Sequence, residues 1–273
     1  MDIDVDNLFE PSAKVKPSDL TFKAYLQNPV EVSINAYLIQ YQDKNILVDT
    51  GAGELFGSNA GKLLQTLKQY GLTPDQITDI LITHIHLDHV GGLVINNSIV
   101  YPKAIIHVNE VELDSWTKTI DESKNQNIAS KEQQKIAEDV QRVVLTCFKA
   151  NQIKTFKNAP GNLLPNIQVL PTVGHTPGHT VFVLTSNKES MYFWGDLIHV
   201  ESVQFQDPFM TNHFDQDMQL AKQVRDSFYH NMAEAQSLIA AAHQSFPGIG
   251  RIQKKQKKYR WIPVPFSVIG RTK

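Results

Sequence analysis

The segment THIHLDHVGG at positions 83–92 gathers three of the chain's 10 histidines and one aspartate. In an extended segment, side chains two residues apart point to the same side, so the imidazoles of His84 and His86 can reach one ion. Asp88 and His89 follow directly and can take a second ion beside the first. Because neutral imidazole and carboxylate are usual ligands of zinc and related divalent ions, the segment predicts a metal site rather than a polar loop.

Three further positions carry the same donor types at the ends of apolar segments. His175 stands in the turn GHTPGH, Asp196 follows the apolar run 191–194, and His243 follows the apolar run 238–242. Strand ends hold side chains rigidly, which a site with defined metal distances requires. These three residues are therefore the candidate partners of the histidine-rich segment.

The other polar candidates have simpler interpretations. Asp49 either accepts a hydrogen bond from a ligand imidazole or forms a turn. His107 is expected to be a structural strand histidine, and His179 is expected to support a ligand residue from behind or to stabilise a turn, rather than to bind an ion. His213 and His230 are expected to carry no chemistry.

Alternating strands and helices must position these residues. In the first half the hydrophobic pattern predicts strands near 32–39, 45–49 and 80–83, a helix over 60–70 and a helix start at 73–76. In the second half it predicts strands at 167–171, 180–186, 190–195 and 238–242 and a helix near 216–229. Strand–helix alternation in both halves predicts an α/β layered sandwich.

Two local features complete this scaffold. Gly91 and Gly92 remove side-chain bulk where the backbone is expected to pass close to the bound ion, and a helix is expected to open at Val90. The polar segment at about 109–150 has one apolar face at helical spacing, which predicts a helical insertion packed on the scaffold. A single domain over residues 1–273 is therefore expected.

Composition excludes several classes of protein. The chain is 41% hydrophobic and 20% charged, with a formal net charge of -2, so bulk electrostatics give no signal for nucleic acid or a membrane surface. The basic run at 254–258 is interpreted as a solvated turn between two strands. A single cysteine, Cys147, excludes an internal disulfide and a cysteine-based zinc site, and it is expected to be buried.

Targeting signals are weak. No apolar run reaches the roughly 18 residues needed to cross a bilayer, so membrane insertion is not expected. The N-terminal segment MDIDVDNLF lacks the basic and apolar regions of a signal peptide. This favours the cytoplasm, although a periplasmic or secreted form with its leader removed is also compatible with the sequence.

The order His84-x-His86-x-Asp88-His89, then His175, Asp196 and His243, resembles the metallo-β-lactamase superfamily over about 30–245. The resemblance implies an αββα four-layer sandwich with a dinuclear site at the edge of its sheets. It implies that His84, His86 and His175 hold one ion, that Asp88, His89 and His243 hold the other, and that Asp196 bridges them. The two divalent ions are expected to be zinc, while the same donors also suit Mn, Co or Fe.

Within the superfamily, the segments at 48–51, 83–92, 195–199 and 243–248 are most similar to N-acyl-homoserine lactonases and methyl-parathion-hydrolase-like enzymes. Two features argue against a true β-lactamase: Asp196 stands where those enzymes commonly use cysteine, and Asp88 is followed directly by His89. Gln244 and Ser245 depart from the more aromatic, proline-rich stretch that relatives often carry there.

The resemblance implies a dinuclear metallohydrolase that opens the ring of N-acyl-homoserine lactones, and so quenches quorum signals, by attack of a metal-bridging hydroxide. Asp88 would accept and return the proton, and His199 would either face the substrate or be a plain surface histidine. The alternatives are an organophosphate triester or other ester hydrolase and, in another class, a non-catalytic metal-bearing binding protein. The expected partner is thus a small lactone or ester, and the oligomeric state, a homodimer included, stays open. Candidates for an apolar substrate wall, or alternatively for core, are Trp116, Trp194, Phe205, Phe209, Met210 and Phe214.

Overall fold

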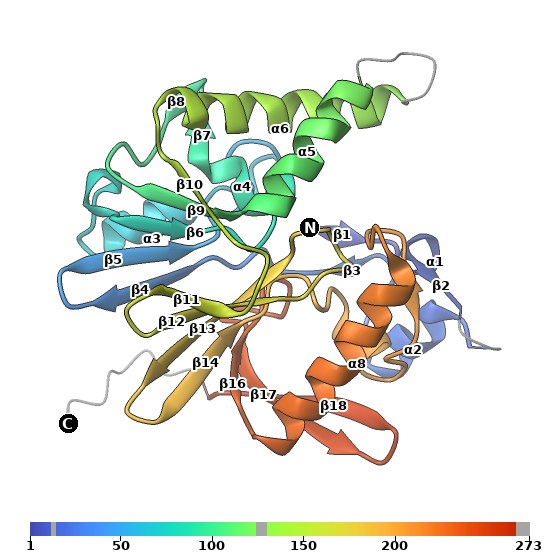
Figure 1. Cartoon of the computed structure of the whole chain (residues 1–273). Helices are drawn as coiled ribbons and strands as arrows, with labels where there is room; N and C mark the ends of the chain where they lie inside the picture. The colour runs from blue at the N-terminus through green and yellow to red at the C-terminus, as the bar shows by residue number, and fades with distance from the viewer. Residues whose placement is uncertain (12–14, 124–129, 266–273) are drawn as a thin grey trace.

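Two β-sheets lie face to face in the computed structural model, which describes residues 1–11, 15–123 and 130–265, and helices cover the outer face of each sheet (Figure 1). One apolar core separates the sheets and includes Ile46, Leu81, Phe182 and Phe193. Each sheet also has a second core on its outer face, between the sheet and its helices. The predicted αββα sandwich is confirmed.

The first sheet is mostly parallel. Its strands, in spatial order, are β10 (Ile153–Phe156), β9 (Ile105–Asn109), β6 (Asp79–Leu81), β5 (Lys44–Val48) and β4 (Tyr37–Tyr41). Only β4 runs antiparallel to its neighbour. Parallel strands therefore bring the carboxyl ends of β5, β6 and β9 to one edge of this sheet.

The second sheet is mostly antiparallel. Its strands, in spatial order, are β11 (Gly161–Leu164), β12 (Ile167–Pro171), β13 (Thr180–Ser186), β14 (Glu189–Phe193), β16 (Leu238–Ala240), β17 (Ile249–Lys255) and β18 (Lys258–Pro263). β14 and β16 are parallel, and Phe193 is paired with Ala240. The basic run lies at the turn between β17 and β18, as predicted.

Helices α3 (Leu63–Gln69), α4 (Leu87–Val90), α5 (Glu110–Ser123) and α6 (Lys131–Lys149) contribute to the core on the first sheet, and α8 (Met218–Glu234) packs on the second. α5 and α6 form the predicted insertion, whose residues 124–129 lie outside the described parts of the chain. Trp116, Ala137, Val140 and the buried Cys147 anchor it in the first-sheet core. The insertion therefore shares a core with the scaffold, while the single-domain assignment for 1–273 stays a prediction.

A fourth apolar cluster joins the N-terminal segment to the loop after β14. It is built from short elements: α1 (Val5–Leu8), α2 (Pro17–Lys23) and α7 (Glu201–Gln204), with β1 (Asp2–Ile3) paired to β3 (Val30–Glu31) and β2 (Phe9–Glu10) paired to β15 (Thr211–Asn212). The remaining short elements are the hairpin β7 (Val94–Ile95) and β8 (Ser98–Ile99) and two 3-10 turns, Pro74–Gln76 and Gly91–Leu93.

Three predicted elements differ from the structure. The strand expected over 32–39 begins only at Tyr37, because the Asn35 backbone N–H donates to Ala242 O of the other half instead of to a sheet neighbour. The helix start at 73–76 is a single 3-10 turn, because β6 begins at Asp79. The helix expected to open at Val90 is only the 3-10 turn Gly91–Leu93, with Val90 as its N-cap, because α4 already ends at Val90.

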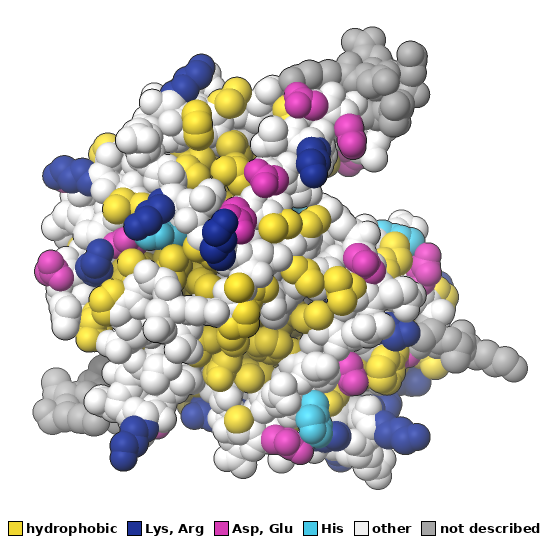
Figure 2. Space-filling view, viewed as in Figure 1, with side chains coloured by type: hydrophobic (Ala, Val, Ile, Leu, Met, Phe, Trp, Pro, Cys, Tyr) yellow, Lys and Arg dark blue, Asp and Glu magenta, His cyan; other side chains and the backbone are white. Residues whose placement is uncertain are grey.

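The surface carries charges of both signs. Figure 2 shows Lys and Arg side chains scattered among Asp and Glu on one face, without merging into one basic surface. In the described parts of the chain, no helix is long and apolar enough to cross a membrane.

Candidate metal centre

The seven predicted ligand residues lie in segments that follow strand ends, and two of them, Asp88 and His89, belong to the short helix α4. The histidine-rich segment follows β6, and His175 follows β12. Asp196 and His243 each stand three residues beyond the paired positions Phe193 and Ala240 of the parallel strands β14 and β16. The pairing of the strands thus brings both side chains to the same edge, where they face the histidine-rich segment that follows β6 of the first sheet.

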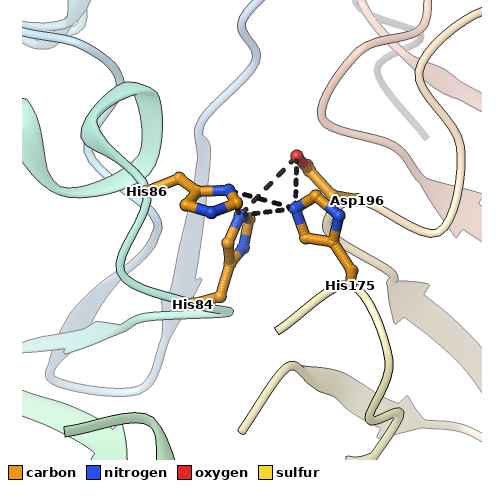
Figure 3. Close-up of side chains that lie close together, drawn as sticks. All are labelled: His84, His86, His175 and Asp196. Carbon is orange, nitrogen blue, oxygen red and sulfur yellow. Dashed lines mark hydrogen bonds and ion pairs between the residues drawn. The ribbon is translucent and has the colours of Figure 1, made fainter. Parts of the chain in front are cut away.

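Three imidazoles and one carboxylate form the first group (Figure 3). His84 Nε2 lies 2.9 Å from His86 Nδ1, and His175 Nε2 lies 3.2 Å and 3.1 Å from these two atoms. Asp196 Oδ2 lies 3.6 Å from His84 Nε2 and 3.4 Å from His175 Nε2. The four ligand atoms lie within 4.8 Å of one another and face a common point.

This arrangement fits a cation better than it fits hydrogen bonds alone. Three ring nitrogens that approach one another pairwise cannot all be satisfied by shared protons, since each N–H needs a lone pair to receive it. In tetrahedral coordination at about 2.0–2.1 Å, two nitrogen ligands lie roughly 3.3–3.4 Å apart. The observed nitrogen spacing is close to that value, so the first group fits a zinc-like ion.

The second group is built around the other oxygen of Asp196. His89 Nε2 and His243 Nε2 each lie 3.1 Å from Asp196 Oδ1 and 3.5 Å from Asp88 Oδ2. Within the described residues, the buried His89 Nε2 and Asp196 Oδ1 have no hydrogen-bond partner. Unsatisfied buried polar atoms of this kind are costly unless an ion takes them. Asp196 Oδ2 faces the first group and Oδ1 the second, and His243 Nε2 lies 3.1 Å from both oxygens, so this carboxylate belongs to both groups.

Hydrogen bonds fix the outer nitrogens of the two candidate ligand histidines in the second group. His89 Nδ1 lies 2.8 Å from Asp49 Oδ2, which answers the question about Asp49 in favour of the imidazole contact. His243 Nδ1 lies 2.9 Å from the Ser33 carbonyl oxygen, which can only accept. Such contacts place the proton on Nδ1 and leave the Nε2 lone pair free for an ion.

The residue behind His175 could not be found by sequence reasoning. His175 Nδ1 lies 3.0 Å from Oδ1 of Asp215, which stands 40 residues later in the chain. Arg225 Nη2 of α8 donates to Asp215 Oδ2 at 2.8 Å, and both side chains are buried. The helix on the second sheet thus holds a ligand of the first group through a carboxylate, and the local sequence around Asp215 carries no signal of it.

Electrostatics divide the histidines into two kinds. Burial and the neighbouring His175 lower the pKa of His86 to about 3, so this ring is neutral. Burial alone would lower the pKa of His175 too, but the carboxylates of Asp196 and Asp215 raise it to about 9. In the same way Asp196, Asp88 and Asp49 raise the pKa of His89 well above its usual value. An ion that binds there must displace protons, so metal affinity should rise with pH.

His199 and His179 both contact Asp196. His199 is buried, with its Nε2 at 3.1 Å from Asp196 Oδ2 and its ring stacked at 5.2 Å on that of His243. His179 Nε2 accepts a hydrogen bond from the Asp196 backbone N–H. His179 thus fixes the loop that carries the shared carboxylate, while the role of His199 toward a substrate stays a prediction.

The candidate apolar wall divides into core and rim. Trp194, Phe205 and Met210 are fully buried in core clusters and do not line the centre. Trp116 is buried in the first-sheet core and packs edge-on against His86 at 6.0 Å, whereas the half-exposed Phe214 lies 5.4 Å from His199. Phe209 is exposed, with Lys222 over its ring.

The two glycines after the histidine-rich segment serve a different contact from the one expected. A Cβ on Gly91 would stand 2.3 Å from Ala52 O, and one on Gly92 would stand 2.2 Å from Thr50 O. Their small size lets this turn pack against the loop after β5, which carries Asp49. They therefore support the Asp49–His89 contact rather than an approach to the ion itself.

Comparisons with known proteins agree with this geometry. The model of the metallo-beta-lactamase superfamily matches residues 29–243. An N-acyl homoserine lactonase of Bacillus sp is 25% identical over 178 residues, which cover 58% of this chain but only 61% of that relative. Because the match spans less than two thirds of the relative, it carries over no activity by itself.

Two solved structures are similar over nearly the whole chain. The hydrolase AbOPH of the beta lactamase superfamily is 32% identical, with a TM-score of 0.88 over 96% of this chain and 90% of that one. AidC, a dizinc quorum-quenching lactonase solved with the product N-hexanoyl-L-homoserine, is 26% identical, with a TM-score of 0.87 over 98% of this chain and 92% of that one. Fold and site together define a metal-dependent hydrolase. The chain belongs to the metallo-β-lactamase superfamily.

Proposed function

We propose that this chain is a dinuclear metallohydrolase that opens the lactone ring of N-acyl-homoserine lactones. The observation that carries the proposal is the shared carboxylate: Asp196 belongs to both histidine groups, so two ions would lie side by side. The likeness to a quorum-quenching lactonase over 98% of the chain supports the choice of a lactone.

Two divalent ions held by these groups would lower the pKa of a shared water toward neutrality and polarise the ester carbonyl. The chain's own part is to fix the ligands. Asp49, Asp215 and the Ser33 carbonyl orient three imidazoles before any ion arrives. This preorganisation removes the cost of ordering the ligands at the moment of binding.

Asp88 is the side chain placed to move the proton. Its side chain is 12% exposed whereas that of Asp196 is 3% exposed, so it is the carboxylate that solvent and substrate reach. Burial would raise the pKa of Asp88, but the imidazoles of His89 and His243 hold it below its usual range. Asp88 is therefore a carboxylate at neutral pH, able to accept a proton and pass it to the leaving alkoxide oxygen.

His199 is proposed as the group beside the reacting ester. Burial is the main cause that lowers its pKa, so the ring is neutral at physiological pH. A neutral ring whose Nε2 donates to Asp196 leaves Nδ1 as an acceptor, and this buried atom has no partner within the described residues. Its neighbour Phe214 supplies an apolar contact for the substrate on the same side.

A pH-stat assay with N-acyl-homoserine lactones of several chain lengths tests the proposal. Ring opening adds water and releases one proton as the product carboxylate forms, whereas the open-chain N-acyl-homoserine releases none and is the matched control. Metal content measured on the same sample should be two ions per chain. Two bound ions without ring opening at any chain length would contradict the lactonase assignment.

Hydrolysis of other esters is the second candidate, because the more identical of the two solved neighbours is described only as a hydrolase of the superfamily. A phosphotriester and a simple carboxylic ester are therefore included in the same assay. Turnover of either one in place of the lactone would identify this alternative. Bound ions with no turnover of any substrate would favour the binding-protein alternative.

A further inference from the structure

Glu112, in the first turn of α5, is a buried carboxylate with four hydrogen-bond donors around it. The residue is 0% exposed. Its Oε1 accepts from the Ile85 backbone N–H at 2.9 Å and from Trp116 Nε1 at 3.1 Å. Its Oε2 accepts from Thr176 Oγ1 at 2.6 Å and from the Gly178 backbone N–H at 3.0 Å. Each oxygen is therefore fully occupied by donors.

These donors belong to the two loops that carry the first histidine group. Ile85 stands between His84 and His86, and Thr176 follows His175 directly. One carboxylate thus connects loops from opposite halves of the sandwich, whose facing ring nitrogens, His84 Nε2 and His175 Nε2, lie 3.2 Å apart. The spacing of these nitrogens depends on how the two loops sit relative to each other.

The backbone is shaped to allow this contact. A Cβ on Gly178 would stand 2.4 Å from the Glu112 backbone nitrogen and 2.5 Å from its Cβ, so only glycine lets the loop reach the helix. One turn further along α5, the Trp116 ring packs edge-on against His86. The start of the insertion is therefore part of the wall behind the first group.

The second group is held by other residues. Asp49 and the Ser33 carbonyl oxygen take the outer nitrogens of His89 and His243. The hydrogen bonds of Glu112 reach only the first-group loops and Trp116. A change at Glu112 should therefore affect the two groups unequally.

We propose that Glu112 is a positioning residue that sets the geometry of the first ion site by joining its two ligand loops. This inference rests on the metal centre proposed above, and it assigns the insertion a role in the ion affinity of the first site relative to the second. Glu112 has no contact with the reacting atoms and acts through His84, His86 and His175.

Glu112→Gln tests the proposal because it keeps the shape and replaces one acceptor oxygen with an NH₂ group that must face donors. The probe is Zn²⁺, titrated against a chelating dye, in two backgrounds that each keep one group. In His243→Ala, where the first group remains complete, Glu112→Gln should weaken Zn²⁺ binding by about 10- to 100-fold. In His86→Ala, where the second group remains, the same change should leave the affinity unaltered.

Two further variants separate positioning from general loss of stability. Thr176→Val removes one donor while the carboxylate stays, and it should weaken only the first site, by about tenfold or less. Asp79→Asn is the matched control, because Asp79 is another buried carboxylate in the same half whose hydrogen bonds go to His107 and Lys44 and not to a ligand loop. It should lower thermal stability and leave both Zn²⁺ affinities unchanged.

Equal weakening of both sites by Glu112→Gln, or of neither, would overturn the proposal. If Glu112→Gln fails to fold, a Thr176→Val variant with unchanged first-site affinity would also overturn it. Because Zn²⁺ affinity is the readout, failure of lactone turnover alone would refute the proposed function and leave this test intact. A wild-type chain that binds no Zn²⁺ would refute both.

Discussion

Two buried aspartate–histidine pairs lie in the first half of the molecule, and they differ in where they stand along the strands. Asp49 Oδ2 lies 2.8 Å from His89 Nδ1, and Asp79 Oδ1 lies 2.9 Å from His107 Nε2. Asp49 follows the end of β5, whereas Asp79 is the first residue of β6. The same chemical pair thus occurs near both ends of the parallel strands.

The second nitrogen of each histidine shows what this difference means. His89 Nε2 faces the carboxylates of Asp88 and Asp196, which gather at the edge of both sheets. His107 Nδ1 has no hydrogen-bond partner within the described residues, and the other oxygen of Asp79 binds Lys44 Nζ at 2.7 Å. A pair at the carboxyl end of the strands joins residues from both halves, whereas a pair at their start only stabilises its own sheet.

Replacing the two histidines should give the largest contrast. His89→Ala removes a proposed ligand of the second group and should lower lactone turnover by about 10³-fold or more, since metal-assisted charge stabilisation contributes several kcal/mol. His107→Ala should leave the turnover per folded molecule unchanged. Steady-state kinetics with Zn²⁺ in excess make the comparison, and a similar loss in both variants would show that the two pairs are not functionally distinct.

Replacing the two aspartates should give a smaller contrast of the same kind. Asp49→Asn leaves every proposed ligand in place but weakens the contact that orients His89, so Zn²⁺ affinity should fall by about 10- to 100-fold. Asp79→Asn should not change it. Competition with a chelating dye measures both, and an unaltered affinity in Asp49→Asn would show that the contact between Asp49 and His89 does not affect ion binding.

The ligand positions were predictable from the sequence because donor residues followed apolar runs of strand length. A strand end could be assigned from the sequence alone to each of five candidate ligands: His84, His86, His175, Asp196 and His243. Their predicted assignment to two ions came from the resemblance to the superfamily and not from the spacing of the residues. Four strands of the second sheet, β12, β13, β14 and β16, followed from local hydrophobicity for the same reason.

Contacts between distant segments were not predictable. Glu112 reaches Gly178 across 66 residues, and Asp215 reaches His175 across 40. An acidic residue near a helix start is common for electrostatic reasons, so Glu112 gave no distinct signal. Trp194 was a candidate for the substrate wall or for the core, and it lies in the core. The sequence could not decide between the two, because an apolar side chain gives the same pattern in either place.

The Asp79 pair should show its role in stability rather than in binding. Burial would raise the pKa of Asp79, but hydrogen bonds from His107 and Lys44 hold it below its usual range. A depressed pKa stabilises the fold above the unfolded value of about 3.9 and loses this effect as the pH falls toward the folded value. Asp79→Asn should therefore lower the free energy of unfolding by about 1.5–3 kcal/mol near pH 7.

Urea unfolding at a series of pH values checks the sign of this effect. The difference between wild type and Asp79→Asn should be constant from neutral pH down to about pH 5 and should shrink below about pH 4, where the carboxylate takes up a proton in the unfolded state first. A difference that grows as the pH falls would mean that the charged form of Asp79 does not stabilise the fold.

The smallest effect is expected at Lys44, the exposed partner of the same pair. Its side chain is 36% exposed while that of Asp79 is 1% exposed, so water screens the ammonium but not the carboxylate. Lys44→Gln should lower the free energy of unfolding by no more than about 1 kcal/mol, and added salt should reduce the difference further. Because His107 still donates to Asp79 in this variant, a loss as large as that of Asp79→Asn would show that the lysine, and not the histidine, neutralises the buried carboxylate.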